Sequence, residues 1–293
     1  MTESRVELGG QTWAIREAGD PNGSPLVYFH GTPSCRLEPA FADATCAELG
    51  VRLVSFDRPG YGESTAQPFG LVSVANATAA VADHLGIGRF TTLGQSGGGP
   101  FSLACAAVLG DRVARAGVTA GAVPFQLVPG ALERLDENDL AALALLPDRD
   151  AAAAGFARGF EPFGVLSRGT DAEVEAWFRA RCTPHEREVL DRPGAAAALV
   201  SSLRASMVAG TEGGGWDNVA WVGPWEIDLA DVGRPVHLWY SAGDRHHPPG
   251  AASWLADHLP DATLHLRDDD SHLGVMEHTR EILGTLLEGG VTR

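Results

Sequence analysis

The stretch Gly94-Gln95-Ser96-Gly97-Gly98 decides the fold that this sequence predicts. It follows a short β-prone run at 90–93 and precedes residues 101–109, whose apolar positions suit a buried helix. A G-x-S-x-G pattern between a strand and a helix is typical of a sharp turn that raises the serine hydroxyl above the edge of a sheet. Glycines are needed on both sides, because a Cβ atom there would collide with a neighbouring strand or helix. We therefore predict that Ser96 is a nucleophile.

An alternation of apolar strands and helices surrounds this turn. Such alternation predicts a parallel sheet with helices on both faces, and Gly9-Gly10 adds a hairpin signal between the first two strands. The strands are predicted at 5–8, 11–17, 25–31, 51–56, 90–93, 115–119, 236–241 and 263–266. The helices are predicted at 39–49, 72–85, 101–109, 250–259 and 274–287.

The alternation breaks between residues 122 and 232, where the sequence offers no convincing strand. Helix-like runs separated by Pro and Gly occur instead, at 131–146, 150–160, 171–181, 184–190 and 195–208. Gly213-Gly214-Gly215 is interpreted as a turn that leads back toward the core. We therefore predict an α/β core domain formed by residues 1–121 and 233–293, with residues 122–232 as an inserted all-helical lid, or cap.

Composition narrows the classes of function and partner. The 293 residues carry a formal net charge of -16, which argues against nucleic acid or an anionic membrane as a partner. The four cysteines lack metal-type spacing and predict free thiols in a reducing compartment. No secretory signal pattern and no apolar run near the ~18 residues of a membrane span occur, so a cytoplasmic protein is expected. The oligomeric state stays open, with a homodimer as one option.

A serine hydroxyl reacts at neutral pH only when a general base removes its proton and an acid orients that base. For this kind of turn the chain order should be serine, then the acid, then histidine. Asp244 follows the predicted strand 236–241, and His272 follows the predicted strand 263–266. Both residues should therefore stand at the carboxyl edge of the sheet beside Ser96, where open α/β sheets bind their ligands.

Other residues compete for these roles. Of the ten histidines, His272 alone lies in a short loop between the last strand and the final helix. The run Asp268-Asp269-Asp270 is interpreted as a solvated acidic surface, although one of its carboxylates could serve His272 if Asp244 did not. The pair His246-His247 predicts no metal site, because adjacent histidines point apart on most backbones and no third ligand is evident.

Hydrolysis at a serine also needs hydrogen-bond donors for the oxyanion. One should be the backbone N–H of Gly97, at the start of a helix whose dipole favours negative charge. The second should come from the loop after an early strand, and here we choose the N–H of Thr32. His30 is interpreted as a buried structural group, and residues 57–64 as a rigid turn.

The chain resembles the α/β-hydrolase superfamily, in particular its lidded group of small-molecule esterases, C–C bond hydrolases and proline iminopeptidases. The resemblance is carried by His-Gly-Thr-Pro at 30–33, Asp-Arg-Pro-Gly-Tyr-Gly-Glu-Ser at 57–64, the turn at 94–98, Gly-Asp at 243–244 and Ser-His at 271–272. These motifs span nearly the whole chain outside the helical insertion. The resemblance implies an α/β fold with an eight-stranded, mostly parallel sheet, an antiparallel second strand, and a triad of Ser96, Asp244 and His272.

No subfamily is matched closely. Dehalogenases and epoxide hydrolases of this fold use an aspartate where this chain has Ser96, and proline iminopeptidases usually read G-G-S-W-G where this chain has Gln95 and Gly97. We favour a serine hydrolase that cleaves a small ester or related acyl substrate through an acyl-enzyme on Ser96, with no cofactor and no metal. Substrate choice is expected to rest on the lid. Aromatic residues on lid helices serve packing more often than ligand contact. Those that could line a pocket here are Phe156, Phe160, Phe163, Trp177, Phe178 and Trp216.

Two alternatives stay open. An aminopeptidase of the proline iminopeptidase type would need a lid carboxylate aimed at the substrate ammonium, for instance from Glu161, Asp171, Glu173 or Glu175. A non-catalytic small-molecule-binding protein could be built on the same fold.

Overall fold

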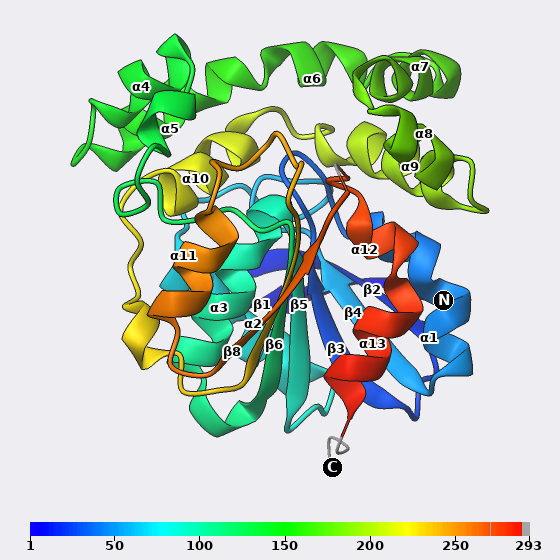
Figure 1. Cartoon of the computed structure of the whole chain (residues 1–293). Coiled ribbons are helices and arrows are strands. Elements are labelled where there is room, and N and C mark those ends of the chain that lie inside the picture. The colour runs from blue at the N-terminus through cyan, green and yellow to red at the C-terminus, as the bar shows by residue number, and fades with distance from the viewer. Residues whose placement is uncertain (270, 289–293) are drawn as a thin grey trace.

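One sheet runs through the computed structural model, which describes residues 1–269 and 271–288 (Figure 1). The eight strands of this described part are β1 (Thr2–Leu8), β2 (Gln11–Gly19), β3 (Ser24–Phe29), β4 (Val51–Phe56), β5 (Phe90–Gln95), β6 (Val113–Thr119), β7 (Val236–Ser241) and β8 (Ala262–Arg267). Their order is β1-β2-β4-β3-β5-β6-β7-β8. β2 is antiparallel to β1 and β4, and the other pairs are parallel. The expected mostly parallel sheet with an antiparallel second strand is therefore confirmed.

Helices cover both faces of the sheet. The α-helices of the core are α1 (Asp43–Glu48), α2 (Leu71–His84), α3 (Gly99–Val108), α11 (Ala251–His258), α12 (Gly274–Glu277) and α13 (Thr279–Leu287). Short 3-10 turns are η1 (Glu38–Ala42), η2 (Ser96–Gly98), η3 (Gly110–Arg112), η4 (Leu132–Arg134) and η5 (Leu229–Asp231). Side chains of α2, α3 and α11 share one apolar cluster, and those of α1, α12 and α13 share another.

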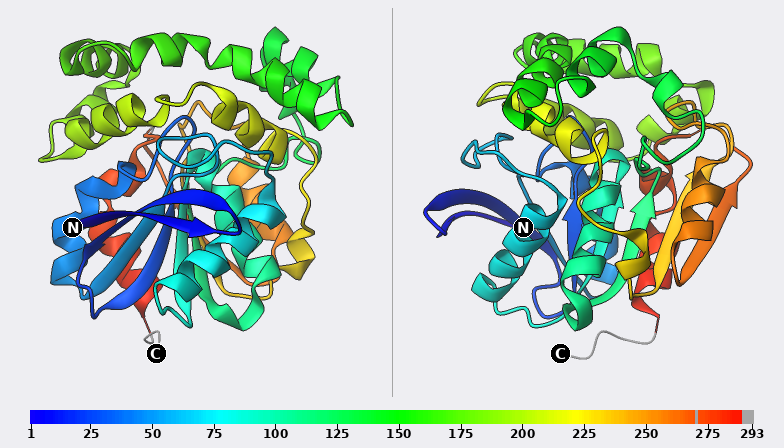
Figure 2. Two further views of the ribbon diagram at one scale, coloured as in Figure 1. Left: turned by 180° about the vertical axis from the view of Figure 1, so that it is seen from behind. Right: turned by 90° about the vertical axis from the view of Figure 1, so that its left-hand side faces the viewer.

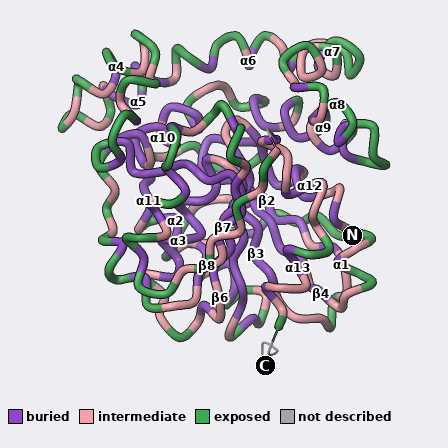
Figure 3. The backbone as a smooth tube through the Cα atoms, viewed as in Figure 1, coloured by how far each residue is buried: buried purple, intermediate pink, exposed green. Residues whose placement is uncertain are grey.

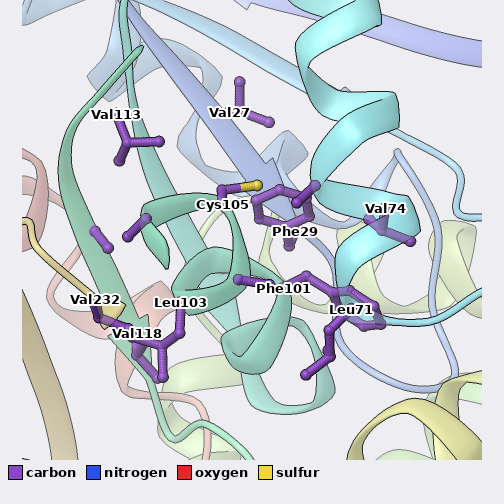
Figure 4. Close-up of a cluster of buried hydrophobic side chains, with 14 of the residues drawn as sticks. Val27, Phe29, Leu71, Val74, Phe101, Leu103, Cys105, Val113, Val118 and Val232 are labelled. Carbon is purple, nitrogen blue, oxygen red and sulfur yellow. The ribbon is translucent and has the colours of Figure 1, made fainter. Parts of the chain in front are cut away.

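The alternation of side chains along β3 shows how the sequence builds both clusters. Val27 and Phe29 point to the face covered by α2 and α3, where Phe29 lies 6.4 Å from the ring of Phe101 (Figure 4). Leu26 and Tyr28 point to the opposite face, against α1 and α13. Full burial of one such side chain stabilises the fold by about 1.5–3 kcal/mol. A strand that is apolar on both sides is thus fixed in the centre of the sheet.

The chain between β6 and β7 is helical, and we call α4 to α10 the helical segment. Its helices are α4 (Glu137–Leu143), α5 (Arg149–Gly159), α6 (Glu161–Leu166), α7 (Asp171–Arg181), α8 (Pro184–Leu190), α9 (Ala195–Ser206) and α10 (Glu212–Trp221). They lie across one end of the sheet in every view (Figures 1 and 2). The central strands are buried, whereas the outward sides of α4 and α7 are exposed (Figure 3). Among the helices of the described residues, none is long and apolar enough to cross a membrane.

The three glycines at 213–215 correct the predicted turn, because they lie inside α10. A Cβ on Gly213 would lie 2.8 Å from the ring of Tyr61, one on Gly214 would lie 2.6 Å from the ring of Phe160, and one on Gly215 would lie 2.3 Å from a carbonyl oxygen of α5. These glycines therefore allow close packing between helices and do not reverse the chain. Their helix-breaking tendency is outweighed by tertiary contact.

The cysteines are free thiols, as the sequence predicts. Cys35, Cys46 and Cys105 are buried and Cys182 is partly buried, with no disulfide among the four. Burial raises the pKa of the Cys46 and Cys105 thiols to about 12. Such thiols stay protonated and unreactive at neutral pH.

Candidate active site

Ser96 stands on a sharp turn between β5 and α3, in a left-handed backbone conformation with φ of 52°. A Cβ on Gly94 would lie 2.3 Å from the carbonyl oxygen of Gly98, and one on Gly98 would lie 2.2 Å from the carbonyl oxygen of Phe29. Any larger residue at these two positions would force the turn open. The steric reason that the sequence suggested for these glycines is thus present in the structure.

The loops after β7 and β8 bring Asp244 and His272 to the same edge of the sheet as Ser96. His272 Nε2 lies 3.0 Å from Ser96 Oγ, and His272 Nδ1 lies 2.7 Å from Asp244 Oδ2. Asp244 Oδ1 also accepts the backbone N–H of His246 at 2.9 Å, which fixes the carboxylate. The three side chains chosen from the sequence therefore form one continuous chain of hydrogen bonds. A histidine placed between a hydroxyl and a carboxylate in this way can move a proton to and from that hydroxyl.

Asp244 and His272 shift each other's pKa values in opposite directions. Burial is the largest influence and opposes the charged form of His272. The carboxylates of Asp244, Glu186 and Glu38 together outweigh it, so the pKa of His272 is held above its ordinary value of 6.5. Burial also opposes ionisation of Asp244, yet the nearby imidazole and the backbone N–H of His246 hold the pKa of this carboxyl well below its usual range. Asp244 is therefore ionised whenever His272 is ready to accept a proton.

Two backbone donors lie beside the serine. Gly97 begins the helical turn after Ser96, and a Cβ on Gly97 would lie 2.3 Å from Thr32 Oγ1, so the two residues are packed against each other. The two residues chosen as oxyanion donors thus lie against each other beside Ser96, and their donor role stays a prediction.

The loop at 30–33 is held rigidly around Thr32. The N–H of Gly31 donates to the buried carboxylate of Glu38 at 3.0 Å, and burial raises the pKa of this carboxyl. Arg58 donates to the carbonyl oxygens of His30 at 2.7 Å and Gly31 at 3.1 Å. His30 itself is buried and donates from Nδ1 to the Gly31 carbonyl at 2.8 Å, which is the structural role expected for it.

The turn at 57–64 is crosslinked by hydrogen bonds to its first aspartate. Asp57 is fully buried and accepts the backbone N–H of Arg36 at 2.7 Å and that of Glu63 at 3.0 Å. Its Oδ2 also accepts the Arg36 guanidinium at 2.6 Å. The turn carries Arg58, whose contribution to the site the sequence motif does not reveal.

A cavity of about 270 Å³ opens above Ser96 and is bounded by both the sheet edge and the helical segment. The apolar residues that the helical segment contributes to it are Phe163, Trp177, Phe178, Leu199 and Leu203. Of the six aromatic residues considered from the sequence, Phe156, Phe160 and Trp216 do not line this cavity and pack between helices. Cys182 also lines it, but burial raises the pKa of this thiol to about 11, which leaves it a poor nucleophile.

Sequence reasoning missed two side chains that hold the peptide of His272. The Gln95 amide donates to the His272 carbonyl at 2.9 Å, and Glu186 Oε1 accepts the His272 N–H at 2.8 Å. Glu186 also closes a capping box with Thr183 at the start of α8. The spacing from Thr183 to Glu186 predicts such a box, but no sequence pattern indicates its contact with a residue 86 positions away.

The other acidic and histidine residues near Ser96 do not join the hydrogen bonds that link Ser96, His272 and Asp244. Asp268 is exposed, Asp269 Oδ1 accepts the backbone N–H of Ser271 at 3.2 Å, and Asp270 lies outside the described residues. The His247 ring is turned to the carbonyl of Ala120 at 2.7 Å, so it points away from the cavity that His246 lines.

Ligand atoms of Asp244, His246 and His272 lie within 4.8 Å of one another, a spacing that could hold a metal ion. The hydrogen bonds between Asp244, His272 and Ser96 already use two of these three groups. The arrangement therefore suits proton transfer at Ser96.

Comparisons with known proteins identify the family of the fold. The model of the alpha/beta hydrolase fold family matches residues 24–279. Over 57 residues the chain is 44% identical to the pimeloyl-[acyl-carrier protein] methyl ester esterase of Aromatoleum aromaticum, a match that covers 20% of this chain and only 23% of that protein. It is 26% identical over 280 residues to the magnesium-chelatase 30 kDa subunit of Rhodobacter capsulatus, covering 92% of this chain and 88% of that protein.

Solved structures share the whole fold. The proline iminopeptidase of Mycobacterium smegmatis superposes with a TM-score of 0.61 and 22% identity, covering 97% of this chain and 96% of that one. Because the family model extends over strands β3 to β8, the turn at Ser96 and the loops that carry Asp244 and His272, the chain belongs to the alpha/beta hydrolase fold family.

Proposed function

We propose that the protein is a serine hydrolase that cleaves a small ester or related acyl substrate through an acyl-enzyme on Ser96. The observation that carries the proposal is the hydrogen-bonded chain from Asp244 through His272 to Ser96 at the base of the cavity. Membership of the alpha/beta hydrolase fold family supports a hydrolase. The local similarity to a methyl ester esterase supports an ester as the substrate class.

The proposed reaction has two halves. His272 Nε2 takes the Ser96 proton as Oγ attacks the substrate carbonyl carbon, and the N–H groups of Thr32 and Gly97 stabilise the resulting oxyanion. The protonated His272 then gives its proton to the leaving alcohol, which breaks the ester bond and leaves an acyl group on Ser96. Water, activated by His272, releases the acid and restores the serine. Asp244 keeps the imidazole oriented and stabilises its charged form throughout.

The helical segment is proposed to act as a lid that selects the acyl or alcohol group. Phe163, Trp177 and Phe178 form an aromatic wall in which neighbouring rings lie 5.3 Å apart, edge to face. Such a wall favours an apolar substrate group.

A fluorophosphonate probe tests the catalytic role of Ser96. The wild-type protein should be labelled at one site, the Ser96→Ala variant should not be labelled, and p-nitrophenyl esters of graded chain length should give a burst of p-nitrophenol from the wild type alone. Far-UV circular dichroism controls for folding. A folded wild-type protein that neither labels nor hydrolyses any ester in the series would reject the hydrolase and favour a ligand-binding protein on the same fold.

An aminopeptidase is the second candidate, favoured by the likeness to the iminopeptidase structure. An aminopeptidase is expected to use one of the lid carboxylates of Glu161, Asp171, Glu173 and Glu175. None of these four residues lines the cavity. Two other carboxylates, those of Glu38 and Glu186, do line it, but each already accepts backbone N–H groups. An aminoacyl p-nitroanilide hydrolysed faster than the matched ester would support this candidate instead.

A further inference from the structure

Asp217, on α10 of the helical segment, contacts the loop that holds Thr32. Its carboxylate is fully buried and forms a two-pronged ion pair with Arg58, at 2.7 Å and 2.6 Å. The same carboxylate accepts the hydroxyl protons of Thr32 at 2.6 Å and Tyr61 at 2.8 Å. Because Arg58 in turn binds two carbonyl oxygens of the 30–33 loop, Asp217 fixes that loop both directly and through the guanidinium.

A second carboxylate of the helical segment reaches the other side of the site. Glu186, on α8, is buried, and its Oε1 accepts the backbone N–H of His272 at 2.8 Å. Its Oε2 accepts the N–H of Thr183 at 2.8 Å, so the side chain is held by its own helix while it holds the loop after β8. The Gln95 amide binds the carbonyl of the same His272.

We infer that the helical segment is a built-in part of the catalytic machinery, in which Asp217 positions the oxyanion loop through Thr32 and Glu186 positions the base through the His272 peptide. The inference rests on the proposed hydrolase function, since it assigns roles relative to Ser96. Each carboxylate is a positioning residue, because neither lies at the reacting atoms and each acts through a neighbour. Opening of α8 or α10 away from the sheet would therefore release the base or the oxyanion donor together with the substrate.

Buried carboxylates are well suited to this task. A carboxylate that accepts N–H or O–H donors makes shorter and stronger hydrogen bonds than a neutral acceptor, and a displacement of about 1 Å at a reacting group can lower the rate by about 100-fold. Apolar contacts alone would hold the helices over the sheet with far less directional control.

The first test is Glu186→Gln. Glutamine cannot accept both N–H groups, so kcat for a p-nitrophenyl ester should fall about tenfold with KM nearly unchanged. The acid limb of the kcat/KM profile should also move to lower pH, because Glu186 is one of the anions that favour charged His272. The other charged or titratable groups facing His272 are Asp244, Glu38, His246 and His247, and the variant leaves them unchanged.

Glu188→Gln is the matched control, because Glu188 is exposed on the same helix. It should leave kcat and the pH profile at wild-type values. If Glu186→Gln is folded and shows the wild-type kcat and the wild-type acid limb, the assignment of Glu186 is overturned.

The second test uses the Thr32 hydroxyl, because replacing Asp217 leaves Arg58 buried without a partner and endangers folding. Thr32→Val removes the bond to Asp217 but keeps the ion pair, and it should lower kcat about tenfold, whereas Thr32→Ser should keep most of the wild-type rate. If Asp217→Asn also folds, the double variant Thr32→Val/Asp217→Asn should lose less than the product of the two single losses.

The experiments distinguish failure of the positioning roles of Asp217 and Glu186 from failure of the proposed hydrolase function. A wild-type protein that fails to label with fluorophosphonate rejects the hydrolase itself. A labelled, active wild type together with an unaffected Thr32→Val variant, or with fully multiplicative losses in the double variant, rejects the role of Asp217 while the hydrolase stands.

Discussion

The carboxyl edge of the sheet and the helical segment face each other across one cavity, but they contribute different kinds of group. The sheet edge supplies Ser96, His272 and Asp244 from the loops after β5, β8 and β7. The helical segment supplies mainly apolar walls, together with carboxylates that bind loops of the core. The contrast shows that strand ends place the hydrogen-bonded side chains of Ser96, His272 and Asp244, whereas helices place the apolar walls of the cavity.

The strongest test of this contrast is the loss of a sheet-edge group. His272→Ala should lower kcat by about 10⁵–10⁶-fold and Asp244→Asn by about 10⁴-fold, because the base is lost in the first and held in the wrong tautomer in the second. Both are measured with a p-nitrophenyl ester and checked for folding by thermal unfolding. A folded His272→Ala variant with more than a hundredth of the wild-type kcat would contradict the role of His272 as the general base.

A smaller loss of kcat is expected when a side chain is added at Gly97, beside the proposed oxyanion donors. Gly97→Ala would place a Cβ 2.3 Å from Thr32 Oγ1 and 2.9 Å from its Cβ, so the loop must move and kcat should fall about 100-fold. Gly284→Ala is the control, because a Cβ there meets nothing within 4 Å. It lies within α13 and should raise the free energy of unfolding by about 0.5–1 kcal/mol without changing kcat. Equal kcat values for the two variants would contradict the packing of Gly97 against Thr32.

The change of kcat/KM with pH should be smaller than the loss caused by Gly97→Ala and larger than the effects of changing the apolar wall. The proposed mechanism requires neutral His272, and its pKa lies above 6.5, so kcat/KM should rise with pH through that raised value. At one pH unit below 6.5 the rate should be at least about tenfold below its plateau. A stopped-time ester assay across this range measures the effect, with pH-stability of the protein checked by preincubation. A plateau that persists to pH 5.5 would mean that His272 is not the titrating base.

The smallest effect is expected on the apolar wall. Trp177→Ala should raise KM a few-fold for long-chain esters and leave kcat for an acetyl ester within about twofold, because the indole lines the cavity but does not take part in the hydrogen bonds between Ser96, His272 and Asp244. Phe156→Ala is the contrasting variant, since Phe156 is fully buried outside the cavity, and its main effect should be about 3–5 kcal/mol of lost stability. A large fall in kcat for the acetyl ester with Trp177→Ala would give the wall a role in the chemistry itself.

The same contrast explains what the sequence could predict. Ser96, Asp244 and His272 were predictable because strand order places the loops that follow β5, β7 and β8 at one edge, whatever the spacing between them. The partners Glu186 and Asp217 were not, because each binds a group far away in the chain, and its acceptor role has no local sequence pattern.

The ends of the helices in the helical segment were harder still to predict from the sequence. Residues 131–146 read as one helix, yet α4 begins only at Glu137, where Asp136 caps it by accepting the N–H of Asp139 at 2.8 Å. The glycines at 213–215 resembled a turn because their need for close packing is visible only once α5 and Tyr61 are in place. Local chemistry thus predicted the type of structure, and tertiary contacts set its limits.

The left-handed backbone at Ser96 has a thermodynamic consequence of its own. A residue with a Cβ costs about 1–2 kcal/mol at this φ of 52°, whereas glycine adopts it freely. Ser96→Gly should therefore unfold at a higher urea concentration than Ser96→Ala, although both lack the nucleophile. A glycine at this position would favour stability, whereas the proposed nucleophile requires a serine, so the native chain carries a local backbone strain at Ser96 that a stability optimum would not include.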